Sequence, residues 1–278
     1  MGSGVSALRT FEKGLEVIGN NIANVNTTGF KGSSVQYADS FSNILQHSSS
    51  NGLGSTNAIA VGTGVGVAGI STNFAQGQLS STGNGSDLGI SGNGFFTVKS
   101  PSDSTTYVTR AGNFSWNSNG YLTTLSGERV QGVTSAGTVG DIKLGTPPTG
   151  TELQSVSIDK SGNVIEFYSD GSSANTNQIL LQSFSNPAAL VKEGNNLYSG
   201  MAAAGPTTGS ITLSASGANA PGSNGLGSIQ AGSLELANVD LTEEFSNLIT
   251  AQRSFQAGSR LITVSDTVLD DIVNLKQR

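Results

Sequence analysis

The most regular stretch of this chain is residues 240–275, which read DLTEEFSNLITAQRSFQAGSRLITVSDTVLDDIVNL. Apolar residues recur in it every seven positions, and small or apolar residues follow three positions after most of them. The first set is Leu241, Leu248, Phe255, Ile262 and Leu269, and the second set is Ala251, Gly258, Ser265 and Ile272. A heptad repeat over several turns predicts a long helix that packs along another helix.

Three further details of this stretch refine the prediction. Asp240 followed by Glu243 resembles a capping box and marks the start of the helix. A glycine inside a helix costs about 1 kcal/mol, so Gly258 indicates close packing against a partner. The apolar face is also wider than one partner helix would cover, because it includes Leu261, Val264, Val268 and Leu275 beside the heptad positions.

The N-terminal stretch carries a matching pattern. Its apolar residues are three or four positions apart, which is an a/d seam of about five turns. They are Leu8, Phe11, Leu15, Ile18, Ile22 and Val25. Lys13 and Glu16 have the spacing of a helical ion pair, and Gly29 supplies a stop signal. We therefore expect residues 1–30 and 238–278 to form a terminal helical assembly domain, in which the two seams pack together.

An isolated pair of such helices gains little stability. Ordering one residue costs roughly 1–2 kcal/mol of backbone entropy, and burying a large aliphatic side chain returns about 1.5–3 kcal/mol. Only 35% of the chain is hydrophobic, so the two contributions nearly cancel in a single pair of ends. We therefore predict that the ends are poorly ordered in the monomer and become helical when neighbouring copies cover the widened face.

The composition argues against several classes of function. Only 12% of the 278 residues are charged, the net charge is −6, and no basic run is present, so nucleic-acid binding is not expected. There is no cysteine and only one histidine, His47, so we expect no disulfide, no metal site and no cofactor. The sequence contains no run of about 18 apolar residues, so a membrane-spanning helix is not expected. The start of the chain does not resemble a cleavable signal peptide.

Between the ends, 38 glycines and many Ser, Thr and Asn residues predict a body of strands and turns. We expect a β-rich outer domain over residues 79–237, with hairpins at Asn119-Gly120 and at residues 159–162. A further turn is expected at Gly92-Asn93-Gly94, which lies between two apolar runs. Residues 209–213 and 227–236 are expected to form short strands.

Residues 31–78 are expected to connect the two domains. Within them, residues 30–46 are predicted to be irregular or a short helix, and residues 47–62 to be a flexible Ser/Asn/Gly loop. The fold class is therefore α+β. Long terminal helices form a coiled coil, and a central antiparallel β-rich domain has Gly-rich turns.

One motif suggests an alternative function, a nucleotide-binding enzyme. Gly64-x-Gly66-x-x-Gly69 matches the dinucleotide fingerprint, which requires a strand before it, a helix after it and an acidic residue about 20 positions on. The residues that follow are turn formers without helical periodicity. We therefore expect a strand with a bare face here, and no catalytic residue is assigned.

Two further groups of residues carry weaker signals for binding. Trp116 and Tyr121 fit the stacking platform of a carbohydrate-binding adhesin, although packing within a hairpin core is the simpler expectation for both. Asp159 and Asn163 have the spacing that begins a calcium loop, but the later ligands are missing. A turn is therefore predicted at residues 159–163.

Three segments carry a resemblance to a known family. Residues 15–31, LEVIGNNIANVNTTGFK, resemble the N-terminal signature of bacterial flagellar rod and hook proteins. The family's central segment is similar to SGNGFF at 91–96 and YVTRAGNF at 107–114. Its C-terminal signature is similar to NVDLTEEF at 238–245 and QRSFQA at 252–257. The matches come in order and span nearly the whole chain, except for residues 47–60 and 200–230.

This resemblance implies a structural subunit of the bacterial flagellum that is not an enzyme. In the family, the two terminal helices form an inner coiled-coil tube around a central channel, and the β-domain forms an outer layer. The implied partners are further copies of the chain, other axial proteins of the rod, hook cap and hook–filament junction, and the export apparatus. Export through that apparatus implies a location in the flagellar hook or basal body without a cleaved signal peptide.

Within the family, the sequence favours the hook. Residues 64–96 and YADSFSNIL at 37–45 resemble hook proteins. A hook subunit would self-assemble through its terminal helices into a tube that transmits torque and houses the export channel. The alternative is a distal or proximal rod subunit of the basal body, because the distal rod protein is a close relative of similar length.

Overall fold

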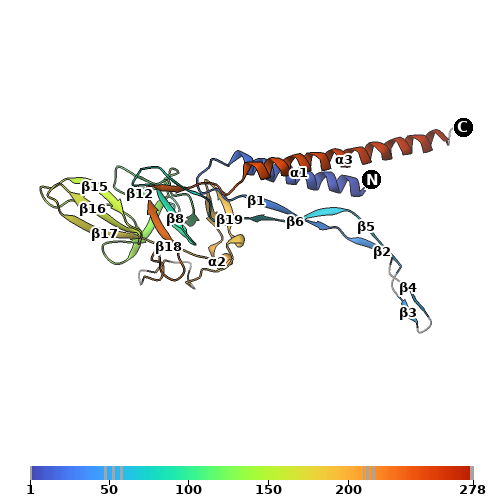
Figure 1. Cartoon of the computed structure of the whole chain (residues 1–278). Helices are drawn as coiled ribbons and strands as arrows, with labels where there is room; N and C mark the ends of the chain where they lie inside the picture. The colour runs from blue at the N-terminus through green and yellow to red at the C-terminus, as the bar shows by residue number, and fades with distance from the viewer. Residues whose placement is uncertain are drawn as a thin grey trace. The chain divides into compact units, whose positions relative to one another are not determined.

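The computed structural model describes residues 2–46, 49–51, 54–56, 59–208, 210, 213–214 and 217–275 (Figure 1). Internal contacts divide the chain into two compact units. Unit 1 comprises residues 1–23, 32–73 and 239–278, and unit 2 comprises residues 24–31 and 74–238. The division expected from the sequence, into an assembly domain, a connector and an outer domain, concerns the assembled protein and stays a prediction. His47 lies outside the described residues.

Unit 1 contains the two terminal helices, α1 (Gly2–Ala23) and α3 (Leu241–Leu275). Asp240 caps the start of α3. Its Oδ1 accepts hydrogen bonds from the backbone N–H groups of Thr242 at 2.7 Å and Glu243 at 3.4 Å. The predicted start of this helix is therefore confirmed. Neither described helix is long and apolar enough to cross a membrane.

Helix α1 ends earlier than its apolar seam predicted. The backbone N–H of Thr27 donates to the carbonyl of Asn24 at 3.0 Å, so a turn stands where the helix was expected to continue. Gly29 follows with a left-handed φ of +68°, which glycine adopts without steric cost. Val25 therefore lies outside the helix, and the seam of α1 ends at Ile22.

The two helices pack antiparallel. A Cβ placed on Gly258 would lie 3.1 Å from Leu8 Cδ2, so glycine at this position lets the helices approach closely. Near the other end of the pair, Asn21 Nδ2 donates to Glu244 Oε1 at 2.8 Å. Partial burial raises the pKa of Glu244, and the hydrogen bond from Asn21 opposes that rise. Residue numbers thus rise along α1 as they fall along α3.

The segment between the helices in unit 1 folds into a ladder of antiparallel strands (Figure 1). Strand β1 (Ser33–Asp39) pairs with β6 (Val65–Thr72), and a bulge lies between Gln36 and Tyr37. The hairpin continues through β2 (Ser42–Gln46) with β5 (Ile59–Gly62) and β3 (Ser49–Asn51) with β4 (Gly54–Thr56).

This ladder corrects two predictions and confirms a third. The irregular or helical segment predicted over residues 30–46 is wrong, and so is the loop predicted over residues 47–62 wherever the structure describes it. Ser and Asn are poor strand formers, but the hydrogen-bonding partners of β1 lie 26 to 39 positions away, which local sequence does not reveal. The strand predicted over Val61 to Ile70 is confirmed in part, because β5 ends at Gly62 and β6 begins at Val65.

Unit 2 consists mainly of short antiparallel strands. They are β7 (Leu79–Ser81), β8 (Leu88–Ser91), β9 (Phe95–Lys99), β10 (Thr106–Thr109), β11 (Ser115–Trp116), β12 (Leu122–Thr123), β13 (Arg129–Val133), β14 (Val139–Asp141), β15 (Leu153–Ile158), β16 (Asn163–Tyr168), β17 (Ser173–Ile179), β18 (Leu181–Gln182), β19 (Val191–Gly194), β20 (Leu197–Ser199), β21 (Ser228–Ala231) and β22 (Ser233–Glu235). Two single turns of helix accompany them, the 3-10 helix η1 (Pro187–Ala189) and α2 (Met201–Ala204).

The largest sheet has twelve strands. Its main path runs β15-β16-β17-β13-β9-β10-β20-β19, and β11, β12, β14 and β18 attach beside that path. Two small sheets pair β8 with β21 and β7 with β22. These small sheets join the end of the chain that leads into α3 to the strands around residue 80.

The hairpins predicted at glycine turns are confirmed. Trp116 pairs with Leu122 across the Asn119-Gly120 turn, and Ile158 pairs with Val164 across residues 159–162. The predicted strands at residues 227–236 are β21 and β22, whereas residues 209–213 fall largely outside the described residues. Strands β8 and β9 flank residues 92–94, but they belong to different sheets.

The apolar core belongs to unit 2. Among the residues that the structure describes, every hydrophobic side chain that is buried lies there. The larger cluster includes Phe96, Val130 and Ile179, and the partly buried Trp116 packs against it. In a second cluster, Phe95 contacts Phe184 edge to face, with ring centroids 5.7 Å apart.

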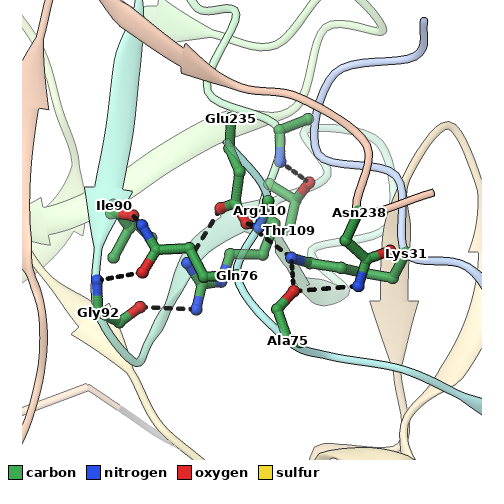
Figure 2. Close-up of polar contacts among 11 residues, drawn as sticks. Lys31, Ala75, Gln76, Ile90, Gly92, Thr109, Arg110, Glu235 and Asn238 are labelled. Atoms are coloured by element: carbon green, nitrogen blue, oxygen red, sulfur yellow. Dashed lines mark hydrogen bonds and ion pairs between the residues drawn. The ribbon is translucent and has the colours of Figure 1, made fainter. Parts of the chain in front are cut away.

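A buried ion cluster joins distant segments of unit 2 (Figure 2). Lys31 Nζ lies 2.6 Å from Glu235 Oε1, and Arg110 Nη1 lies 3.1 Å from Glu235 Oε2. Backbone carbonyls accept further hydrogen bonds from both cations. Lys31 Nζ donates to Ala75 O at 2.7 Å, and Arg110 Nη2 donates to Gly92 O at 2.8 Å. The side chains are 0%, 4% and 0% exposed for Lys31, Arg110 and Glu235.

Burial is the main influence on both cations. It lowers the pKa of Lys31, and Glu235 opposes this effect by favouring the charged amine. Burial likewise lowers the pKa of Arg110, again against the attraction of Glu235. The single carboxylate of Glu235 therefore holds two cations in a region without solvent, and its loss would leave both of them uncompensated.

The first prediction concerns this carboxylate. Glu235→Gln should destabilise unit 2 by about 3–5 kcal/mol, because breaking a buried ion pair leaves unpaired charge in the interior. Urea unfolding followed by tryptophan fluorescence would measure the change, since Trp116 packs against the core. Glu16→Gln is the matched control, because Glu16 pairs with Lys13 at 2.7 Å on an exposed surface. Equal unfolding midpoints for the two variants would contradict the prediction.

The second prediction concerns the helix pair. Gly258→Leu should weaken the packing of α3 on α1 by about 1–3 kcal/mol, because the added carbons overlap Leu8. Gly19→Ala is the control, since a Cβ on Gly19 meets nothing within 4 Å and alanine gains up to about 1 kcal/mol of helix propensity. Thermal loss of circular dichroism at helical wavelengths, recorded on assembled copies in which the helices are expected to be ordered, measures both variants. Equal effects of the two substitutions would refute the packing role of Gly258.

Candidate functional site

The candidate functional surface is the apolar surface of unit 1. The buried residues of its helices are Thr10, Gly14, Asn21 and Gly258, which are polar residues or glycines. Large apolar side chains in the described part of unit 1 are half-buried or exposed. Unit 1 therefore lacks a closed apolar core in the single chain, and its apolar residues are available to a partner.

The predicted seam of α1 is half-buried along its length. It comprises Leu8, Phe11, Leu15, Ile18 and Ile22. The helix also contacts the β-ladder, which the sequence did not predict. Thr10 Oγ1 donates to Val65 O at 3.2 Å, and the Phe11 and Tyr37 rings meet edge to face at 6.4 Å. The alternation of Val35 and Tyr37 with polar residues was the one local signal for this ladder.

The predicted seam of α3 is only partly covered. Gly258 is buried, and Leu248 and Ile262 are half-buried. Ala251 and Ser265 are also half-buried, whereas the remaining members are exposed, namely Leu241 at 39%, Phe255 at 36%, Leu269 at 47% and Ile272 at 57%. Helix α3 has 35 residues and α1 has 22, and Ile262 lies beside Gly4 near the start of α1, so Leu269 and Ile272 lie beyond the end of the partner helix.

A groove runs between the helices and the ladder within unit 1. Its volume is about 320 Å³, and its walls include Phe11, Ile18, Val35, Tyr37 and Ala251. Polar groups such as Asn247 and Ser254 also line it. A groove lined by both apolar and polar side chains suits contact with a side chain of another protein. No cluster of metal-ligating residues is found in the described part of the chain.

The glycine motif at residues 64–69 does not have the context of a nucleotide site. Val65 to Thr72 form β6, which pairs with β1 as one side of a hairpin, and β7 rather than a helix follows. Gly64 has a φ of +139°, and a side chain there would collide with Ser6. This glycine therefore serves the packing of α1 on the ladder.

The residues considered for carbohydrate and calcium binding have structural roles. Trp116 packs against the core of unit 2, and Tyr121 is covered by the Arg129 guanidinium at 4.2 Å from its ring centroid. Asp159 Oδ1 accepts hydrogen bonds from the backbone N–H groups of Ser161 at 2.9 Å and Asn163 at 2.8 Å, which confirms the predicted turn. The two aromatic rings therefore do not form an open stacking platform.

The charged cluster of unit 2 has no access to solvent. Glu235 and Lys31 are fully buried, and Gly77 N–H donates to Glu235 Oε1 at 2.8 Å. A substrate cannot reach groups that are enclosed in this way. The cluster positions the segments of the fold, and sequence reasoning did not anticipate it because its members lie up to 204 positions apart.

Three family models match this chain. Residues 1–31 match the flagella basal body rod protein model, residues 89–166 match the flagellar hook protein FlgE/F/G D1 domain, and residues 230–275 match the flagellar basal body rod FlgEFG protein C-terminal model. These ranges contain most of the segments on which the sequence resemblance rested. The resemblance is therefore confirmed.

Individual relatives agree with these matches. The chain is 40% identical over 277 residues to the flagellar basal-body rod protein FlgG of Bacillus subtilis, covering 99% of this chain and 98% of that protein. It is 34% identical to the FlgG of Caulobacter vibrioides, covering 98% and 100%. The flagellar hook protein FlgE of Borreliella burgdorferi is 44% identical over 133 residues, which are 47% of this chain and 30% of the hook protein. The chain therefore belongs to the flagellar rod and hook protein family.

Proposed function

We propose that this chain is a rod subunit of the flagellar basal body. The observation that carries the proposal is the length of the alignments. Rod relatives align with this chain over 98% and 100% of their length, whereas the hook relative aligns over 30% of its length. The hook assignment that the sequence favoured has less support than the rod assignment. The segments that resemble hook proteins do not distinguish a hook protein from a rod protein when both contain them.

The distribution of apolar surface supports self-association. Leu261, Val264, Val268 and Ile272 on α3 are 65%, 60%, 51% and 57% exposed. Burying one such side chain completely stabilises an assembly by about 1.5–3 kcal/mol, so covering these side chains by a neighbouring copy favours association. We infer that α1 and α3 of many copies pack into a coiled-coil tube, whose wall transmits torque and whose channel serves export.

The proposed role is structural rather than catalytic. The buried charges of unit 2 are enclosed, and the glycine motif forms part of a hairpin. The proposed partners are further copies of this chain and other axial proteins of the flagellum, together with the export apparatus.

A localisation experiment tests the rod proposal. Immunogold labelling of isolated hook–basal bodies should place gold particles on the rod, below the hook. The control is labelling with antibody that has been absorbed with the purified chain, which should remove the signal. Gold on the hook and not on the rod would overturn the proposal and identify a hook subunit instead.

A second experiment tests the role of the terminal helices. Amide hydrogen exchange over residues 5–25 should be at least about 100-fold slower in assembled filaments than in dilute monomer, because neighbours then cover the helix pair. Amides of strands β9 and β13 in the core of unit 2 serve as the internal control and should change little. Strong protection of residues 5–25 in the dilute monomer would refute this expectation.

A further inference from the structure

A cavity of about 340 Å³ lies on one face of the large sheet of unit 2. Its walls come from the neighbouring strands β14, β13, β9 and β10, from α2 and from the segment that follows α2, and they include Thr97, Lys99, Gln131, Val139, Met201 and Leu213. Successive side chains of a strand point to opposite faces of a sheet. Because Phe96 and Val98 of β9 belong to the larger core cluster, Thr97 and Lys99 stand on the other face.

Thr97 brings an unpaired hydroxyl group to this cavity. Its Oγ1 is buried without a hydrogen-bond partner, and the residue is 2% exposed. Native proteins pair nearly all of their buried polar groups, so an unpaired hydroxyl on the wall of a cavity indicates a position where a bound group completes the bonding. Rotation about the Cα–Cβ bond exchanges the hydroxyl and methyl branches of threonine, so either branch can face a group that enters.

Lys99 adds a positive charge two positions along the same strand. In the sheet it pairs with Thr106 of β10 on one side and with Arg129 of β13 on the other. Arg129 is compensated, because its Nη1 lies 2.9 Å from Asp141 Oδ2. Lys99 takes part in none of the ion pairs found in the described part of the chain. Together these three charged side chains therefore leave one positive charge beside the cavity.

This combination of groups selects the chemistry of a ligand. An ammonium group and a hydroxyl group both donate hydrogen bonds, and a carboxylate has two oxygens that accept them. Val139, Met201 and Leu213 supply apolar surface next to these donors. A carboxylate on a short aliphatic stem therefore fits the cavity, and this is the structure of an aspartate or glutamate side chain.

We propose that the cavity binds a carboxylate side chain of a second copy of this chain. The inference rests on the proposed self-assembly and assigns to unit 2 a polar contact between copies. With 19 acidic and 13 basic residues, each copy has a net charge of −6, so copies repel one another unless cationic sites receive their carboxylates. Unit 2 also offers exposed carboxylates of its own, at Asp103, Glu152, Asp170 and Glu193.

Cross-linking with a carbodiimide tests this contact on isolated hook–basal bodies. The reagent activates a carboxylate, and a lysine amine in contact with it displaces the resulting urea and forms an amide bond. Mass spectrometry should find Lys99 joined to an aspartate or glutamate of this same sequence. The yield should be at least about tenfold higher than in dilute monomer, because groups held in contact react faster than groups that must collide. The monomer is the control for links within one chain.

The outcomes separate this inference from the proposed function. An equal yield in the monomer would show a link within one chain and overturn the inference. A link from Lys99 to a different protein would overturn the second copy as the occupant. Absence of any Lys99 link in rods that contain this chain would overturn the inference and leave the rod proposal standing. Absence of the chain from rods would overturn both.

Substitution of Thr97 gives a second readout with two opposite signs. Thr97→Val should raise the melting temperature of unit 2 by about 2–4 °C, because the unpaired hydroxyl is removed. The same variant should raise the concentration of free chain in equilibrium with filaments by about tenfold, because a hydrogen bond to a charged group is lost. Thr97→Ser keeps the hydroxyl and should leave that concentration near the original value. Unchanged assembly of the valine variant would contradict the inference.

Removal of the positive charge is the companion test. Lys99→Gln should also raise the concentration of free chain by about tenfold, since the charge-assisted contact is lost. Lys160→Gln is the matched control, because it makes the same change of charge on an exposed turn of unit 2. Equal effects of the two lysine variants would show that only net charge matters and would overturn the assigned site.

Discussion

Packing of α1 against α3 covers only one side of α3. This constraint leaves large apolar side chains of unit 1 exposed in the single chain. Among the described residues, the buried hydrophobic side chains all belong to unit 2, whereas the helices of unit 1 bury Thr10, Gly14, Asn21 and Gly258. Unit 2 therefore has the closed core that an independent domain requires. Unit 1 carries large apolar side chains that become buried only when other molecules contact them.

The signature residues that follow α1 serve unit 2. Gly29 N–H donates to the carbonyl of Glu235 at 2.7 Å, and the Lys192 ammonium lies 4.6 Å from the centre of the Phe30 ring. Lys31 then enters the buried cluster with Glu235 and Arg110. The segment that follows α1 therefore contacts the segment that precedes α3 through Glu235. Because that carboxylate is fully buried, the two segments are fixed where they leave unit 2.

Much of this fold is encoded locally, and the rest depends on pairing over long distances. The heptad pattern, the Asp240 cap and the glycine hairpins are determined within a few residues, so the sequence predicts them correctly. The β1–β6 ladder and the contact of Lys31 with Glu235 join residues 26 to 204 positions apart, so local sequence indicates single strands at most and does not reveal these partners. The same segments do not separate rod from hook, since the family models that match them cover both kinds of protein.

The heptad repeat explains why the α3 seam could be recognised from sequence while its partners could not. Helix α3 is longer than α1, and Ile262 already lies beside Gly4 near the start of α1, so Leu269 extends past its partner helix and reaches solvent in the single chain. Large apolar side chains such as Phe245 and Val264 therefore stay exposed on different sides of α3 in the single chain, and local sequence does not show which surface covers them.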